Sequence, residues 1–161
     1  VVNVAQLGTS ANATIIQWHV VAMFAPSFFT GNLIQRFGII KILLAGLLAY
    51  IVAIATALAG DQFIHYFVAL FLLGLGWNFL YIGGSTLVAS VATAEERGRV
   101  QGVADLATTS VVAMASLTAG SLHSQFGWDV LILAGCVPVA ILACGLGWLG
   151  VHQRRIALSP S

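Results

Sequence analysis

The residues best suited to do chemistry lie inside long apolar runs, and Asp105 is the foremost of them. It is the only Asp, Glu, Lys or Arg within residues 100–123. An ionisable group inside a membrane helix costs about 2.5–3.5 kcal/mol on insertion scales, so it usually faces a polar pathway or a partner. We expect Asp105 to line such a pathway and to bind a cation or carry a proton. The alternative is a carboxylate that reaches the interface or pairs with Arg99 or Gln101.

A second cluster lies near the middle of residues 63–90, where Trp77, Asn78 and Tyr81 occur among several glycines. Trp77 and Tyr81 are four residues apart and therefore share one helix face. An aromatic and amide lining suits a small organic solute, and the glycines permit local unwinding around a ligand. The alternative is a tightly packed helix crossing that keeps Trp77 for its volume.

Two further residues complete the predicted pathway. Thr109 lies on the same helical stripe as Gln101 and Asp105, although such stripes also serve helix–helix packing. His19 stands beside Trp18, about one turn inside the expected outer face, where a histidine titrates near neutral pH. A plain interfacial hydrogen-bonding role is the alternative for His19.

Motifs for catalysis, cofactors and metals are not found in the sequence. Gly84-Ser85 lacks the following glycine of a nucleophile elbow, and no histidine pair has metal-binding spacing on one helix. Six scattered cations and a net charge of +1 give no basic patch for nucleic acid. The sequence therefore predicts no enzyme, no cofactor, no metal site and no nucleic-acid partner.

The elements that position these residues are five apolar runs. The chain is 60% hydrophobic and 7% charged, with a mean hydropathy of +1.01, whereas soluble domains carry about 25% charged residues. About 20 helical residues cross a bilayer. We predict an all-α integral membrane protein, a single membrane domain over residues 1–161. Its five transmembrane helices lie near residues 14–34, 39–60, 63–90, 100–123 and 130–150. Pro26 and Pro138 fall inside two of these runs and predict kinks.

The cations indicate an orientation. All six lie in alternate connections or after the last run: Arg36, Lys41, Arg97, Arg99, Arg154 and Arg155. By the positive-inside rule these segments are cytoplasmic, which places the N-terminus outside and the C-terminus inside a plasma (inner) membrane. The opposite connections hold Asp61 and Asp129 without Lys or Arg. Five crossings that start outside, in a chain beginning with Val1, predict a fragment of a longer protein.

The runs also differ in polarity. Residues 39–60 and 130–150 carry few polar side chains, whereas residues 14–34, 63–90 and 100–123 carry many. Polar side chains in a membrane helix point toward other helices or water. We therefore expect the first two runs to face lipid and the other three to face a shared interior.

Two loops resemble those of the major facilitator superfamily. Residues 31–41, GNLIQRFGIIK, resemble the family's G-x-x-x-D-R-x-G-R-K loop, and residues 95–102, EERGRVQG, resemble its E-R-G-R-x-x-G stretch. The resemblance implies a partial C-terminal bundle, helices eight to twelve. It implies cytoplasmic gating-loop roles for Gly31, Gln35, Arg36, Gly38, Glu95, Glu96 and Arg97. Gln35 stands where the family has an Asp, so this position of the loop carries no charge here.

The resemblance also implies a function. It predicts a secondary active transporter that moves a small organic solute by alternating access, with proton coupling as a further expectation. Its partners would be the lipid bilayer, the missing N-terminal half and the solute. The alternative class is a non-transport membrane scaffold or receptor subunit that binds partner helices.

The physics of the two loops supports local predictions. Gly31 and Gly38 permit a tight turn between helices. Thr93 and Glu96 have the spacing of a capping box at a helix start. Arg36 lies on the same expected membrane side as the glutamates, which suggests an ionic latch.

Overall fold

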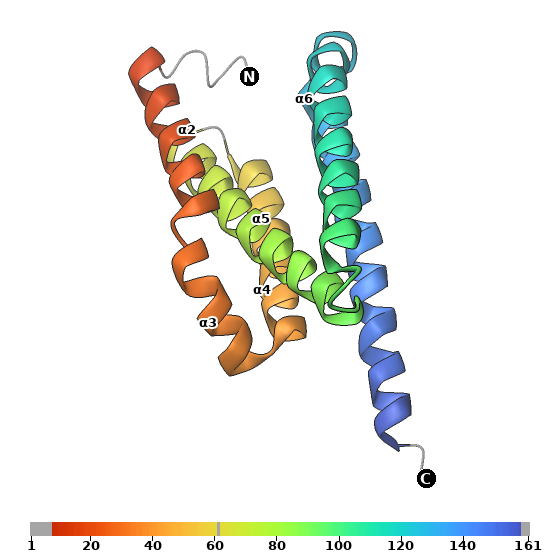
Figure 1. The fold of residues 1–161 in the computed structure, drawn as a ribbon. Helices are drawn as coiled ribbons and strands as arrows, with labels where there is room; N and C mark the ends of the chain where they lie inside the picture. The colour runs from red at the N-terminus through yellow and green to blue at the C-terminus, as the bar shows by residue number, and fades with distance from the viewer. Residues whose placement is uncertain (1–7, 61, 159–161) are drawn as a thin grey trace.

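The computed structural model describes residues 8–60 and 62–158, and within them the side chains of 9, 122–123, 127–129, 131–133 and 151–158 are not described. Five helices make up this part of the chain (Figure 1): α2 (Thr9–Phe24), α3 (Ser27–Phe37), α4 (Ile39–Ala59), α5 (Phe63–Val91) and α6 (Arg97–Leu158). No strand occurs among the described residues. The predicted all-α architecture is confirmed.

The helices are long and apolar enough to cross a bilayer. Three stretches qualify alone, namely Ile39–Ala59, Phe63–Val91 and Arg97–Phe126, and α2 with α3 qualifies as a bent pair. The helical assignment continues through α6 and includes a shorter apolar stretch, Ala134–Gly150. In Figure 1 the ribbon of α6 rises in green and cyan and returns in blue. The division of the chain into five crossings stays a prediction.

A bend of 44° separates α2 from α3, next to Pro26. The last hydrogen bond of α2 runs from Ala25 N to Val21 O, and Phe29 N and Thr30 N then bond to the carbonyl of Pro26. Proline has no N–H to donate and its ring clashes with the preceding turn, so the helical ladder breaks here. The kink predicted at Pro26 is confirmed.

A single residue, Gly38, separates α3 from α4. Its φ of +89° lies in the left-handed region that glycine adopts readily, and its N–H bonds to Ile34 O to close α3. The predicted turn at Gly38 is confirmed. Gly31 instead lies within α3, so the expectation that it helps to make the turn was wrong.

Helix α5 lies between α2 and α4 and approaches both closely through glycines. A Cβ built on Gly74 would lie 2.5 Å from His19 O, and one on Gly76 would lie 2.6 Å from the Tyr50 ring and 2.9 Å from Gly46 O. Small residues permit this approach, and dispersion forces between the closely packed helices then stabilise the contact in a membrane bundle. The glycines of α5 therefore fix its distance from both neighbours.

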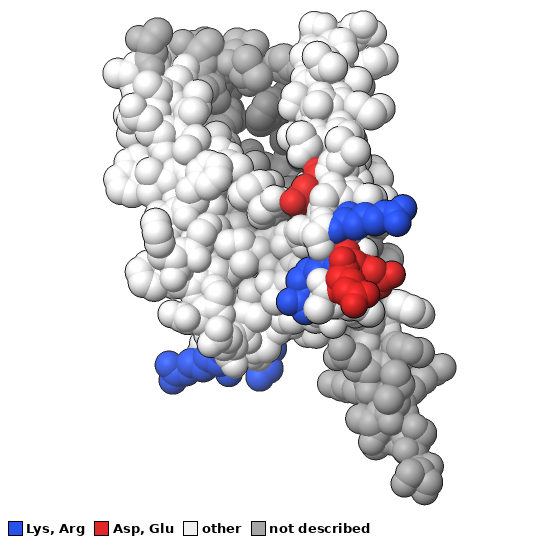
Figure 2. Space-filling model, in the orientation of Figure 1, with Lys and Arg blue, Asp and Glu red and all other residues white. Residues whose placement is uncertain are grey.

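The described cations lie at one end of the bundle. Arg36 lies in the last turn of α3 and Lys41 in the first turn of α4, while Arg97 and Arg99 lie in the first turn of α6. Figure 2 shows Lys and Arg gathered toward the lower end of the face that it draws. The other predictions from charge concern Asp61, Asp129, Arg154 and Arg155, which lie outside the described residues or side chains.

The close approach at Gly74 predicts the effect of one methyl group. Gly74→Ala should lower the free energy of unfolding by about 1–3 kcal/mol, because the added Cβ meets a backbone carbonyl that cannot move away cheaply. Gly84→Ala, in the same helix, meets nothing within 4 Å and should be neutral or stabilising by up to about 1 kcal/mol. Thermal melts of the full-length protein in detergent measure both. Equal melting temperatures for the two variants would contradict this account of the α2–α5 crossing.

Candidate functional site

A pocket of about 340 Å³, lined by both apolar and polar side chains, lies between α5 and the first part of α6. Its lining comes from the face of α5 that meets α6 and from the third and fourth turns of α6: Trp77, Leu80, Tyr81, Gly84, Ser85, Val88, Ala104, Asp105 and Thr108. Three residues predicted from sequence, Trp77, Tyr81 and Asp105, therefore meet at one place. We call it the Asp105 pocket.

The carboxylate of Asp105 is half-buried and held by neutral donors. The Tyr81 hydroxyl donates to Asp105 Oδ1 at 3.3 Å, and Gln101 Nε2 donates to the same oxygen at 3.3 Å. Gln101 Nε2 also donates to Ser85 Oγ at 3.1 Å. No bond to Oδ2, and no ion pair with Arg99, is found among the described residues. One carboxylate oxygen is therefore left to bind a proton, a cation or a solute donor.

Trp77 forms an aromatic wall of the Asp105 pocket. Its ring stacks on Tyr81 with centroids 4.8 Å apart and planes 6° apart, and it meets Phe24 edge-on at 6.0 Å. The expectation that Trp77 and Tyr81 share a face is confirmed. A stacked pair offers a flat apolar surface next to the carboxylate, which suits a planar solute.

Asn78 lies apart from this pocket, buried and 0% exposed. Its Nδ2 donates to Met23 O at 2.7 Å and to Ser27 Oγ at 2.6 Å, and its Oδ1 accepts from Thr30 Oγ1 at 2.7 Å. Both amide protons are therefore used between helices. The sequence grouped Asn78 with Trp77 because they are adjacent, but one step along a helix turns a side chain by about 100°.

These bonds compensate for the backbone hydrogen bonding that is interrupted near Pro26. The carbonyl of Met23 lies in the turn where the α2 ladder ends, and the side chain of Asn78 supplies a donor to it. An unpaired backbone carbonyl in lipid would cost several kcal/mol. Asn78 thus bridges α5 to both sides of the bend, and we call this set of bonds the Asn78 clamp.

The other two pathway candidates lie at different places. Thr109 is exposed and does not line the Asp105 pocket, whereas its neighbour Thr108 does. His19 lies on α2, where its Nδ1 is 2.6 Å from Leu70 O. It lines a separate pocket that shares Trp77 with this one. The described residues contain no group of three or more His, Cys, Asp or Glu that could hold a metal ion.

Sequence reasoning missed three residues of the pocket as site residues. Ser85 and Thr108 line it, and Gln101 bonds to both Ser85 and Asp105. A signal existed, because Ser85 lies four residues after Tyr81, and Gln101 lies four before Asp105. Each pair shares a helix face.

The gating-loop candidates lie at the end of the bundle that carries the described cations, and all seven are exposed: Gly31, Gln35, Arg36, Gly38, Glu95, Glu96 and Arg97. Thr93 Oγ1 accepts from Glu96 N at 3.3 Å, which is one half of the predicted capping box. Glu96 Oε2 accepts from the Thr93 hydroxyl at 2.8 Å, and no bond from Thr93 N to Glu96 is found among the described residues. Arg36 lies over the Phe37 ring, 5.4 Å from its centroid. No ion pair between Arg36 and the glutamates is found among the described residues, so the expected latch is not formed in this structure.

Comparisons with known proteins agree on one family. The model of the Major Facilitator Superfamily matches residues 2–160. The riboflavin transporter RfnT of Brucella anthropi is 48% identical over 116 residues, 72% of this chain and 29% of that protein. The uncharacterized MFS-type transporter YdeG of Bacillus subtilis is 31% identical over 133 residues, covering 81% and 29%. The cis,cis-muconate transport protein of Acinetobacter baylyi is 30% identical over 117 residues, covering 73% and 28%. The chain therefore spans under a third of the length of these relatives. No solved structure matches it.

The Asn78 clamp predicts a hydrogen-bonding role that can be separated from side-chain volume. Asn78→Asp keeps the shape but sets a carboxyl oxygen against Met23 O and Ser27 Oγ, so the protein should lose about 1–3 kcal/mol of stability for the buried carbonyl left without a donor. Thr56→Val removes an exposed bond within α4 and should change stability by less than about 0.5 kcal/mol. Thermal melts in detergent measure both. An Asn78→Asp protein as stable as Thr56→Val would show that the clamp does not hold the bend.

Proposed function

The chain belongs to the major facilitator superfamily, and from this we propose that it forms part of a secondary active transporter that moves a small organic solute by alternating access. The observation that carries the proposal is Asp105, a carboxylate in a pocket between two apolar helices, with one oxygen unpaired among the described residues. Transport fits the family better than the scaffold role that the sequence left open, because a scaffold needs no such group.

The walls of the pocket support a solute class. Trp77 and Tyr81 provide a stacked aromatic surface, and Asp105, Gln101 and Ser85 provide hydrogen-bonding groups at its edge. Two relatives are named for riboflavin and for cis,cis-muconate, both small organic molecules with conjugated planar groups. We propose a planar conjugated solute that lies against Trp77 and bonds to the polar edge.

Asp105 also supports proton coupling. Its Oδ2 has no hydrogen-bond partner among the described residues, so a proton can bind there without breaking either bond to Oδ1. In the proposed cycle Asp105 is protonated from one side of the membrane and releases the proton to the other. Gln101 and Tyr81 hold the carboxyl group in place during both steps.

Alternating access needs a second bundle to rock against this one. The relatives are more than three times the length of the matched segment, which supports the presence of such a bundle in a longer protein. We propose that this chain supplies helices eight to twelve, with α5 and α6 lining the solute path. The loops at residues 31–41 and 95–102 would then lie on the cytoplasmic side, where Arg36 and the glutamates meet the other bundle.

Replacing Asp105 tests the proposal. Asp105→Asn in the full-length protein should lower uptake driven by a pH gradient at least about tenfold, because the amide cannot carry the proton. Radiolabelled riboflavin and cis,cis-muconate serve as probes in proteoliposomes of matched protein content. Thr56→Val, outside the pocket, is the control and should transport at the parental rate. Parental uptake of either probe by Asp105→Asn would remove Asp105 from the pathway.

The orientation has its own test. Alkaline phosphatase, which is active only outside the cytoplasm, should be active when fused after Gly60 and after Gln125. It should be inactive when fused after Phe37, because the basic turn that follows is retained inside. Green fluorescent protein at the same positions should give the reverse pattern. An inactive phosphatase after Gly60 would overturn the proposed topology.

A further inference from the structure

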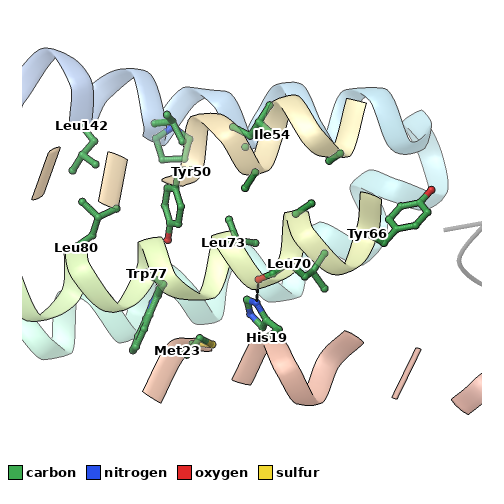
Figure 3. A pocket seen from close by; sticks show the side chains of 16 residues that line it. His19, Met23, Tyr50, Ile54, Tyr66, Leu70, Leu73, Trp77, Leu80 and Leu142 are labelled. Atoms are coloured by element: carbon green, nitrogen blue, oxygen red, sulfur yellow. Dashed lines mark hydrogen bonds between the residues drawn. The ribbon is translucent and has the colours of Figure 1, made fainter. Parts of the chain in front are cut away.

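A second, larger pocket of about 540 Å³ lies between α2, α4, α5 and the later part of α6. Figure 3 shows His19 of α2, Tyr50 of α4, Leu73 and Trp77 of α5, and Leu142 of α6 around it. Its size falls in the range of about 300–1,000 Å³ that is typical of sites for small molecules. Asp105 does not line it. We call it the Tyr50 pocket.

The lining of the Tyr50 pocket excludes charged ligands. It contains no Asp, Glu, Lys or Arg, and most of it is Ala, Leu, Ile and Val. An ion that entered would lose its hydration without gaining an opposite charge, which is very costly in an apolar site. The rings of Trp77 and Tyr50 supply flat surfaces instead. These favour an uncharged aromatic molecule.

Besides Tyr66, two polar side chains interrupt this apolar lining. In Figure 3 the Tyr50 ring extends from α4 toward α5. The ring rests on Gly76, where a Cβ would lie 2.6 Å from it, so its position is set by close packing. No hydrogen bond to this hydroxyl is found among the described residues.

His19 is the second polar group. Its Nδ1 lies 2.6 Å from Leu70 O, and because a carbonyl accepts, Nδ1 must carry the proton and donate. In the neutral ring this leaves Nε2 as an acceptor, and no partner for it is found in the described part of the chain. The Tyr50 pocket therefore offers one acceptor at His19 and one hydroxyl at Tyr50.

We infer that the Tyr50 pocket is a second ligand site, separate from the Asp105 pocket, for an uncharged aromatic molecule that carries a hydroxyl group. The rings of Tyr50 and Trp77 contact the aromatic body, and the hydroxyl bonds to the Tyr50 hydroxyl, with His19 Nε2 as a further acceptor in the lining. A saturated lipid chain fits less well, because it would cover both polar groups without bonding to either. Trp77 and Leu80 line both pockets, so an occupant here touches the ring that stacks on Tyr81.

Binding of 2-naphthol, with naphthalene as its hydroxyl-free match, tests the inference. Equilibrium dialysis of the full-length protein in nanodiscs measures both affinities after subtraction of empty nanodiscs. Tyr50→Phe keeps the ring on Gly76 and removes the hydroxyl. It should weaken 2-naphthol binding about fivefold, the equivalent of one neutral hydrogen bond of about 1 kcal/mol, and leave naphthalene binding unchanged.

Blocking the pocket gives a second measurement. Leu73→Trp adds bulk to the wall at a side chain that is already 38% exposed, so it should abolish binding of both probes without unfolding the protein. Leu48→Trp places the same ring on α4, outside the pocket, at a residue 60% exposed, and should bind both probes as the parent does.

The outcomes separate this site from the transport pathway, because the assay requires no transport. Asp105→Asn should bind 2-naphthol with parental affinity even if it transports nothing. Three results would overturn the inference. The first is parental binding of the probes by Leu73→Trp. The second is loss of 2-naphthol binding in Asp105→Asn alone. The third is displacement of naphthalene by added phosphatidylglycerol together with no effect of Tyr50→Phe, a result that would identify the pocket as a lipid groove.

Discussion

The need to satisfy every backbone carbonyl in an apolar medium governs this structure. Pro26 breaks the ladder of the first bent helix, and the freed carbonyl of Met23 finds its donor on α5, in the side chain of Asn78. That bond fixes the rotation of α5 about its own axis. Trp77 and Tyr81 stand about 100° and 60° away on one side of Asn78, given about 100° per residue. Both rings are thereby turned away from the clamp, toward α6.

Close packing and open space alternate along α5, according to whether glycines or large rings face the neighbouring helices. Where glycines face α2 and α4, the backbones approach until a single Cβ would clash, as at Gly74 and Gly76. Where large rings stand instead, the helices are held apart and pockets remain on both sides of Trp77. The rigid crossings thus hold the rings, and the rings define the cavities. Substitution of one of these glycines should therefore alter the shape of both pockets.

The features that were predicted correctly from the sequence are those that depend on local covalent structure. The kink at Pro26 and the turn at Gly38 follow from a missing N–H and a missing Cβ, and both occur. It also placed Trp77 and Tyr81 on one face, because periodicity alone decides that. It could not place Asn78, whose partners lie 48 to 55 residues away.

Other placements depend on how helices pack. Gly31 and Gly38 look alike in sequence, and only the continuity of α3 shows which one makes the turn. Tyr50 lies in residues 39–60, a run with few polar side chains. Its role depends on Gly76 in another helix, which no periodicity reveals. Asp105 is the opposite case, because the free-energy cost of placing a carboxylate in lipid identifies it as a candidate site residue from sequence alone. Its two donors bond to Oδ1, so the second oxygen remains where a proton or a solute can compensate its charge.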